Sequence, residues 1–141
     1  MESVTEFMRK FFVSAEIATK LEELGYKEPC HAFYIEGDTN EKVIFTEYGG
    51  EMLVYNNVKT RSGKKLIPAP YIVQVVDWLR EKHHLHLIIN WYQGYYLWQI
   101  KLLDADLSDR NSIRSYTSSA RENDYYVQME LGIQAALKLI K

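Results

Sequence analysis

The residues of this chain with the clearest metal-ligating chemistry are three closely spaced histidines, His83, His84 and His86. Neutral imidazole is a common ligand of zinc, and His84 and His86 would project to the same face if both lay on one strand. The spacing therefore suggests, as one alternative, a small metal-assisted hydrolase. The competing interpretation is structural, because a histidine near the C-terminus of a helix interacts favourably with the helix dipole.

A second group with possible chemistry is a basic loop around Ser62-Gly63. Stacking of bases on Tyr92 and Tyr95 beside this loop would give a weak single-stranded nucleic-acid binder. The net charge of −2 and a pI near 6.1 disfavour that function, because the domain offers no general attraction for phosphate. The loop's cations are Lys59, Arg61, Lys64 and Lys65.

Cys30 and His31 are neighbours, and neighbours on a strand point to opposite faces, so they cannot act together as nucleophile and base. A single cysteine also excludes an intramolecular disulfide, and we expect Cys30 to be a small buried hydrophobe. The chain has no nucleophile elbow, zinc-protease helix, dinucleotide fingerprint or phosphate loop. We therefore assign no catalytic, cofactor-binding or metal-binding residue.

The most informative segment is an apolar stretch interrupted by Gln93-Gly94, which predicts a hairpin over residues 85–102. A two-residue loop places an almost wholly apolar set on one face, which we expect to be core. A three-residue loop with a glycine bulge is the rival, and Gln93 needs a positive φ in the two-residue form. The two-residue register pairs Trp91 with Tyr96, Ile89 with Trp98, Leu87 with Ile100 and Leu85 with Leu102 on that face.

The other face of the same hairpin is expected to be half exposed. It carries Ile88, Tyr92, Tyr95 and Leu97, which together offer more apolar area than an exposed face usually shows. Tyrosine is also the compositional outlier, with eleven in 141 residues. Because such rings are enriched at protein interfaces, we take these four residues as the candidate interaction surface.

The remaining segments supply the elements that would position this hairpin. Ser14 and Gly25 delimit a helix, with residues 7–12 either extending it or leading into it, and Pro70 is placed near the first turn of a second helix. Asp124 caps a final helix with one apolar side. Strands are expected over 30–36, 42–48 and 51–55, and a further short strand over 112–117 within a loop at 104–123.

The predicted order is α-β-β-β-α-β-β-α. Hairpins replace βαβ crossovers, so the predicted fold class is α+β, a mostly antiparallel sheet of about five strands packed with about three helices. The length of 141 residues suits a single globular domain over 1–141. Without a secretory leader or an apolar run long enough to cross a membrane, the sequence predicts a cytoplasmic protein that does not contact a membrane.

Four segments carry a resemblance to other proteins: Phe12–Ala18, Lys27–Tyr34, Ile67–Pro70 and Val76–His83. Through them the chain resembles a group of small uncharacterised proteins encoded by phages and prophages of anaerobic gut bacteria. The likeness covers most of residues 12–103 and the final helix, and the group has no assigned activity, so the resemblance implies only a genomic setting. Phage accessory proteins often bind host or phage components. We therefore expect a non-enzymatic binding module that acts through protein–protein contacts, with a host or phage protein or a second copy as partner.

Overall fold

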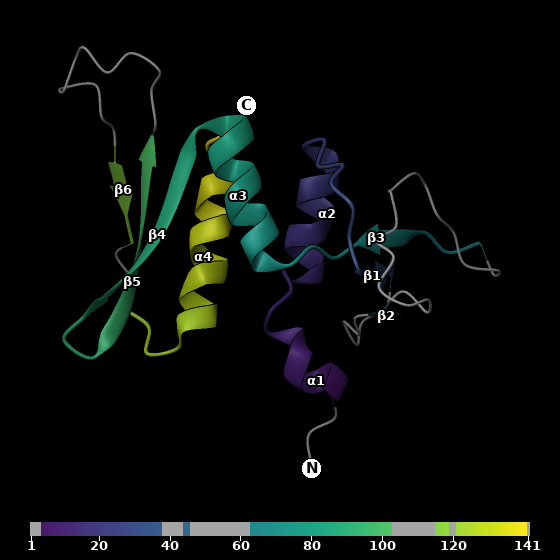
Figure 1. Ribbon diagram of the computed structural model, residues 1–141, viewed down its shortest axis with the longest axis horizontal. Helices are drawn as coiled ribbons and strands as arrows, with labels where there is room; N and C mark the ends of the chain where they lie inside the picture. Colours follow the sequence, from purple (N-terminus) through teal and green to yellow (C-terminus); the bar gives the residue numbers. More distant parts are fainter. Residues whose placement is uncertain (1–3, 38–43, 46–62, 103–114, 119–120, 141) are drawn as a thin grey trace. The chain divides into compact units, whose positions relative to one another are not determined.

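The computed structural model describes residues 4–37, 44–45, 63–102, 115–118 and 121–140 (Figure 1). Within these residues the chain is α+β, with antiparallel pairing throughout both of its sheets. It divides into two compact units, Met1–Ile72 and Val73–Lys141, and the expectation of a single domain stays a prediction. The elements are α1 (Val4–Arg9), α2 (Ala15–Glu23), β1 (Ala32–Ile35), β2 (Ile44–Phe45), β3 (Leu66–Pro68), α3 (Ile72–His83), β4 (Leu85–Tyr92), β5 (Tyr95–Leu102), β6 (Ser115–Thr117) and α4 (Tyr125–Lys138).

The predicted count and order of elements need correction. The described residues hold four helices and six strands, in two three-stranded sheets rather than one. The extra helix is α1, which stays separate from α2 because Ser14 adopts an extended backbone (φ −69°, ψ 164°) and caps α2 through its hydroxyl. Gly25, at φ 88°, follows the end of α2 as predicted.

The first sheet has the strand order β2-β1-β3. The predicted pairing of β1 with β2 is confirmed, whereas the strand expected over 51–55 lies outside the described residues. The other neighbour of β1 is β3, a strand that the sequence analysis did not predict, because a three-residue segment ending in proline has no strand pattern of its own. Pro68 is tolerated there because β3 is the edge strand among the described strands of this sheet, where a missing N–H breaks no ladder on the outer side.

Pro70 lies two residues before α3, close to its first turn as predicted. Residues 70–71 are held extended by two contacts. The Pro70 carbonyl accepts from the Val13 N–H at 3.1 Å, and Tyr71 forms a β-bridge with Phe12. The Phe12 and Tyr71 rings also stack, with centroids 4.4 Å apart. The helix therefore begins only at Ile72.

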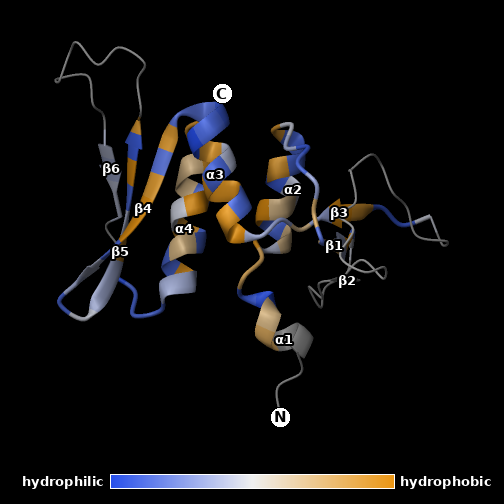
Figure 2. Cartoon of the chain, in the orientation of Figure 1, coloured by the Kyte–Doolittle hydropathy of each residue, from blue (hydrophilic) through white to orange (hydrophobic). Residues whose placement is uncertain are grey.

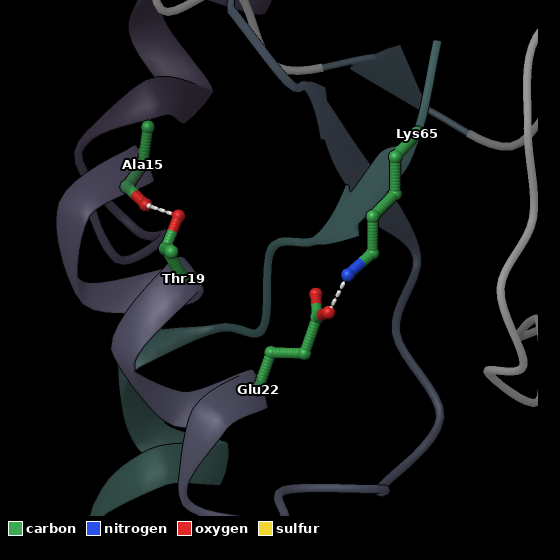
Figure 3. A network of polar contacts seen from close by, with 4 residues as sticks. All are labelled: Ala15, Thr19, Glu22 and Lys65. Carbon is green, nitrogen blue, oxygen red and sulfur yellow. Dashed lines mark hydrogen bonds and ion pairs between the residues drawn. The ribbon is translucent and has the colours of Figure 1, made fainter. Parts of the chain in front are cut away.

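Two separate polar contacts involve residues of α2 (Figure 3). Lys65, next to the start of β3, forms an ion pair with Glu22 of α2. One turn back on the helix, the Thr19 hydroxyl donates to the Ala15 carbonyl at 2.9 Å. Because the side chains of the ion pair are partly exposed, we attribute only a modest stabilisation to it.

The second unit is built on the β4–β5 hairpin, and its predicted register is confirmed at all eight pairs. The loop has two residues, with Gln93 at φ 48° and Gly94 at φ 90°, as the primed turn requires. β6 pairs with the outer side of β5 over Gln99–Lys101 and lies inside the predicted strand 112–117. The sheet order is therefore β4-β5-β6.

Helix α4 packs on one face of this sheet, along β4 and β5 (Figure 1). Its N-cap is Asp124, as predicted, whose carboxylate accepts from the Tyr126 and Val127 N–H groups at 2.9 and 3.3 Å. Helix and sheet approach most closely at Gly132, where a β-carbon would lie 3.0 Å from Trp98 Cβ and 2.8 Å from Leu87 Cδ1. The predicted apolar side of α4 is confirmed at its centre, where Met129, Ile133, Ala136 and Leu137 are buried.

The hydropathy of the hairpin changes along its length. Figure 2 shows β4 strongly hydrophobic near its start, with hydrophilic bands between, and pale towards the β4–β5 turn. The same gradient exists in burial, since Leu85 and Leu87 are buried while Asn90, Trp91 and Tyr92 are exposed. The core of the second unit therefore lies at the base of the hairpin and leaves its turn end uncovered.

Candidate interaction surface

The turn end of the hairpin gathers five rings, Trp91, Tyr92, Tyr95, Tyr96 and Tyr125, which we call the aromatic end. Three of them are well exposed: Trp91 at 61%, Tyr92 at 54% and Tyr125 at 40%. Large rings left in water at this density are unusual for a surface that contacts nothing. Trp91 and Tyr92 are also the two most exposed of the large aromatic rings among the described residues.

The rings of the aromatic end contact one another on both faces of the hairpin. On the face towards α4, Trp91 and Tyr96 lie 4.9 Å apart and Tyr96 and Tyr125 lie 5.5 Å apart, in edge-to-face geometry. On the opposite face, Tyr92 and Tyr95 lie 6.0 Å apart. Edge-to-face contacts of this kind favour particular orientations of the rings and restrict their freedom.

A buried glutamine braces the backbone beneath these rings. Gln128 of α4 is fully buried and donates through Nε2 to the Tyr96 carbonyl at 2.8 Å and to the Ser118 hydroxyl at 3.2 Å. The Tyr96 N–H in turn donates to the Glu122 carbonyl at 2.6 Å. The strand carrying Tyr95 and Tyr96 is thus tied to α4 and to the segment before it.

The four residues predicted as the interaction surface share one face of the hairpin in the observed register. Tyr92 is exposed, whereas Ile88, Tyr95 and Leu97 are half-buried. Within the second unit, α3 and α4 lie on the other side of the sheet, so no described helix of this unit covers this face (Figure 1). Arg121 adds a cation over the Tyr95 ring, 4.7 Å from its centroid.

The hairpin face towards α4 was predicted to be core along its whole length, and this prediction is wrong at the turn end. Trp91 is 61% exposed and Ile89 only half-buried, although Leu85, Leu87 and Ile100 are buried as expected. The reason is the position of α4, whose first turn lies beside Tyr96 and contributes Tyr125 there, without a further turn to cover Trp91. The usable surface therefore includes Trp91 and Tyr125, which the sequence interpretation missed.

The histidine cluster has a different geometry from the one predicted. His84 lies between α3 and β4 with φ 55°, so it does not alternate with His86 along a strand. His83 ends α3 and packs its ring against Trp78, with centroids 4.5 Å apart. Across the described ranges, no three histidine, cysteine, aspartate or glutamate side chains come close enough together to hold a metal ion.

Burial lowers the pKa of His83 below its ordinary value, and the neighbouring His84 lowers it further. The unfolded chain then binds this proton more readily than the folded one, so the free energy of unfolding should fall as the pH drops through about 6.5, the ordinary histidine pKa, towards the folded value. We expect His83→Gln to flatten this dependence. Denaturant titrations at a series of pH values compare the two proteins, and an unchanged slope would contradict the assignment.

The basic loop is described only in part, because Lys59 and Arg61 lie outside the described residues. Lys64 is exposed, and Lys65 is held by its ion pair with Glu22. One of the four cations therefore already has a carboxylate partner. The described part of the loop adds no observation that favours nucleic acid.

Cys30 is buried, as predicted, and its thiol lies 3.4 Å from the Glu28 carbonyl. Burial, followed by the charge of Glu28, raises the pKa of this thiol to about 12. Its neighbour His31 instead contacts Tyr71, with ring centroids 5.7 Å apart.

We expect Cys30 to react slowly with a thiol reagent at neutral pH, because both access and thiolate are scarce in the folded protein. Unfolding in guanidinium chloride should restore the reactivity of an ordinary cysteine. Absorbance after addition of a chromogenic disulfide reagent follows both states. Fast, stoichiometric reaction in the folded state would show that the thiol is accessible.

Comparison of the chain with known protein families, with characterised proteins and with solved structures found no match. Among the described residues, the aromatic end combines the most exposed large aromatic rings with a backbone held by Gln128.

Proposed function

We propose that this chain is a non-enzymatic binding module that holds a protein partner through the aromatic end. The observation that carries the proposal is the exposure of Trp91, Tyr92 and Tyr125 on a hairpin whose backbone is braced by Gln128. Tryptophan and tyrosine contribute disproportionately to protein–protein affinity, because each buries a large area while losing few rotatable bonds. A ring whose orientation is already restricted by its neighbours also loses less conformational entropy on binding.

The rings favour a partner with an apolar patch, and Arg121, Glu122 and Asp124 give the border of the surface charges of both signs. Arg121 lies over Tyr95 at the border of the surface, where a carboxylate of the partner could reach it. By its resemblance to phage and prophage proteins, we place the module among accessory proteins that act in the host cytoplasm on a host or phage protein. No helix in the described ranges has the length and apolarity needed to cross a membrane.

Capture of partners from host lysate tests this proposal. Tagged wild-type protein is compared with a Tyr92→Ala/Tyr95→Ala variant, and the bound proteins are identified by mass spectrometry. Tyr116→Ala is the matched control, because it removes another exposed tyrosine of the same sheet, on β6. We expect a specific partner that the double variant loses and the control keeps; a partner retained by the double variant would refute the proposed surface.

A further inference from the structure

The outer edge of β4 carries unused backbone hydrogen-bonding groups. Tyr92 and Tyr95 flank the two-residue loop and form a hydrogen-bonded pair, so the alternation along the ladder turns the N–H and C=O of Ile89 and Trp91 away from β5. Their partners on β5, Trp98 and Tyr96, also direct their backbone groups away from the hairpin. Tyr96 bonds outward to Glu122, and the Trp98 N–H and C=O bond outward to Ser118.

The two edges of the hairpin therefore differ in how far their backbone groups are hydrogen-bonded. The outer side of β5 is occupied by β6, Ser118 and Glu122 up to the turn, whereas Ile89 and Trp91 have no such partner among the described residues. The sequence of β4, Leu-His-Leu-Ile-Ile-Asn-Trp-Tyr, also lacks the lysine, glutamate or proline that commonly protects an edge strand. Since Leu85 and Leu87 are buried, the accessible part of this edge is its last four residues, Ile89–Tyr92.

We propose that this edge pairs with the same edge of a second copy of the chain, antiparallel and with the two-fold axis at Asn90. The inference rests on the proposed function, and it names a second copy of the chain as one protein that binds at the aromatic end. Antiparallel pairing follows from the two-fold symmetry, which makes one edge complementary to itself. Four backbone hydrogen bonds form, two at each pairing of Ile89 with Trp91 of the partner subunit.

The side chains select this register. It places Trp91 beside Ile89 of the partner subunit on one face and Tyr92 beside Ile88 of the partner subunit on the other. Aromatic rings opposite β-branched residues are favourable cross-strand pairs, so the two most exposed rings of β4 gain apolar neighbours. At the axis the two Asn90 side chains meet, amide to amide.

A register centred on Ile89 would give poorer side-chain pairs and would need a less accessible stretch of the edge. Centring the axis on Ile89 would set Ile88 against the amide of Asn90 of the partner subunit, which removes an apolar contact. It would also need the backbone edge at Leu87, which is buried. The accessible edge and the side-chain pattern thus agree on Asn90 as the centre.

Cysteine cross-linking reads this register directly. In the proposed dimer the two Cα atoms at position 90 form a non-hydrogen-bonded pair about 4.5 Å apart, within the range that a disulfide spans. Asn90→Cys should therefore give a dimer band on a non-reducing gel after mild oxidation. Ile88→Cys, on the same face, places its two thiols about four residues, or about 14 Å, apart and should not cross-link. The wild type controls for buried Cys30.

Sedimentation equilibrium of the intact chain over a wide concentration range completes the test. Wild type should be dimeric, and Asn90→Lys should be monomeric because two like charges meet at the axis. Thr117→Lys adds the same charge to the same face on β6, away from the edge of β4, and should remain dimeric. Circular dichroism confirms that each variant is folded.

A monomeric wild type, or a dimer that Asn90→Lys leaves intact, would overturn the inference. Either result leaves the proposed function standing if Tyr92→Ala/Tyr95→Ala still abolishes capture of another protein. If that double variant changes no capture while Asn90→Cys cross-links as expected, the pairing is supported and the partner is the second copy alone.

Discussion

Replacing Gly132 with valine is expected to lower the free energy of unfolding by about 1–3 kcal/mol, the usual range for overpacking a tight interior. A β-carbon at this position would lie 3.0 Å from Trp98 Cβ and 3.2 Å from Trp98 Cγ, inside ordinary contact distance. The Trp98 Cβ is fixed to the strand, so relief requires α4 to move away from the sheet. The higher helix propensity of valine offsets only a few tenths of a kcal/mol of this loss.

Gln134→Val is the matched control for this change. Gln134 lies two residues further along α4 and is only half-buried, so the same side chain is added there without meeting the sheet. Urea denaturation followed by circular dichroism measures both variants. Equal stability of Gly132→Val and Gln134→Val would contradict the close approach of α4 to β5.

The second large effect is expected at Gln128, where Gln128→Glu should lower the free energy of unfolding at neutral pH by roughly 3–5 kcal/mol. The glutamine is fully buried and donates to the Tyr96 carbonyl, and a carboxylate there would present a second acceptor to that carbonyl without solvent to screen it. The loss should be accompanied by a weaker tie between α4 and the strand that carries Tyr95 and Tyr96.

The pH dependence of this variant identifies the cause. Burial raises the folded pKa of the introduced carboxyl above its unfolded value of about 4.3, so the destabilisation should shrink as the pH falls through the folded pKa towards that value. Gln128→Met removes the donors without adding charge and should cost about 1–3 kcal/mol at every pH. A Gln128→Glu loss that does not change with pH would argue against a buried carboxylate.

The hairpin could be predicted from sequence in detail because one turn fixes many pairs at once. Gln93-Gly94 sets the register, and the alternation of apolar residues then tests it at each position, so the eight observed pairs follow from one local choice. Helix ends were predictable for the same reason. Ser14 and Asp124 act on N–H groups two or three residues away and need no tertiary information.

The misses arose where distant segments decide the structure. β3 exists because residues 66–68 pair with β1, more than thirty residues earlier, and its short sequence with Pro68 has no strand pattern of its own. The exact start of α3, at Ile72, also depends on a distant partner, because the Pro70 carbonyl accepts from the Val13 N–H. The division into two sheets likewise follows from long-range pairing that no local period reports.

Only part of the candidate surface could be predicted, because the rest depends on where a distant helix lies. Alternation identified Tyr92 and Tyr95 as lying on the face away from the core, but it also assigned Trp91 to the core, since period-two patterning describes faces and says nothing about where a covering helix begins. Asp124 did fix the start of α4 in the sequence. What the sequence lacked was the axial position of that helix along the hairpin, which leaves Trp91 61% exposed.

Photo-crosslinking from within the aromatic end tests the binding function most directly. Tyr92 is replaced by a photoreactive phenylalanine analogue, and Tyr116, an exposed tyrosine of the same sheet on β6, is replaced in the control protein. Both proteins are irradiated in host lysate and cross-linked species are identified by mass spectrometry. We predict one dominant partner protein, or a second copy of this chain, from position 92 and background labelling from position 116; equal labelling from the two positions, or none from position 92, would contradict the account.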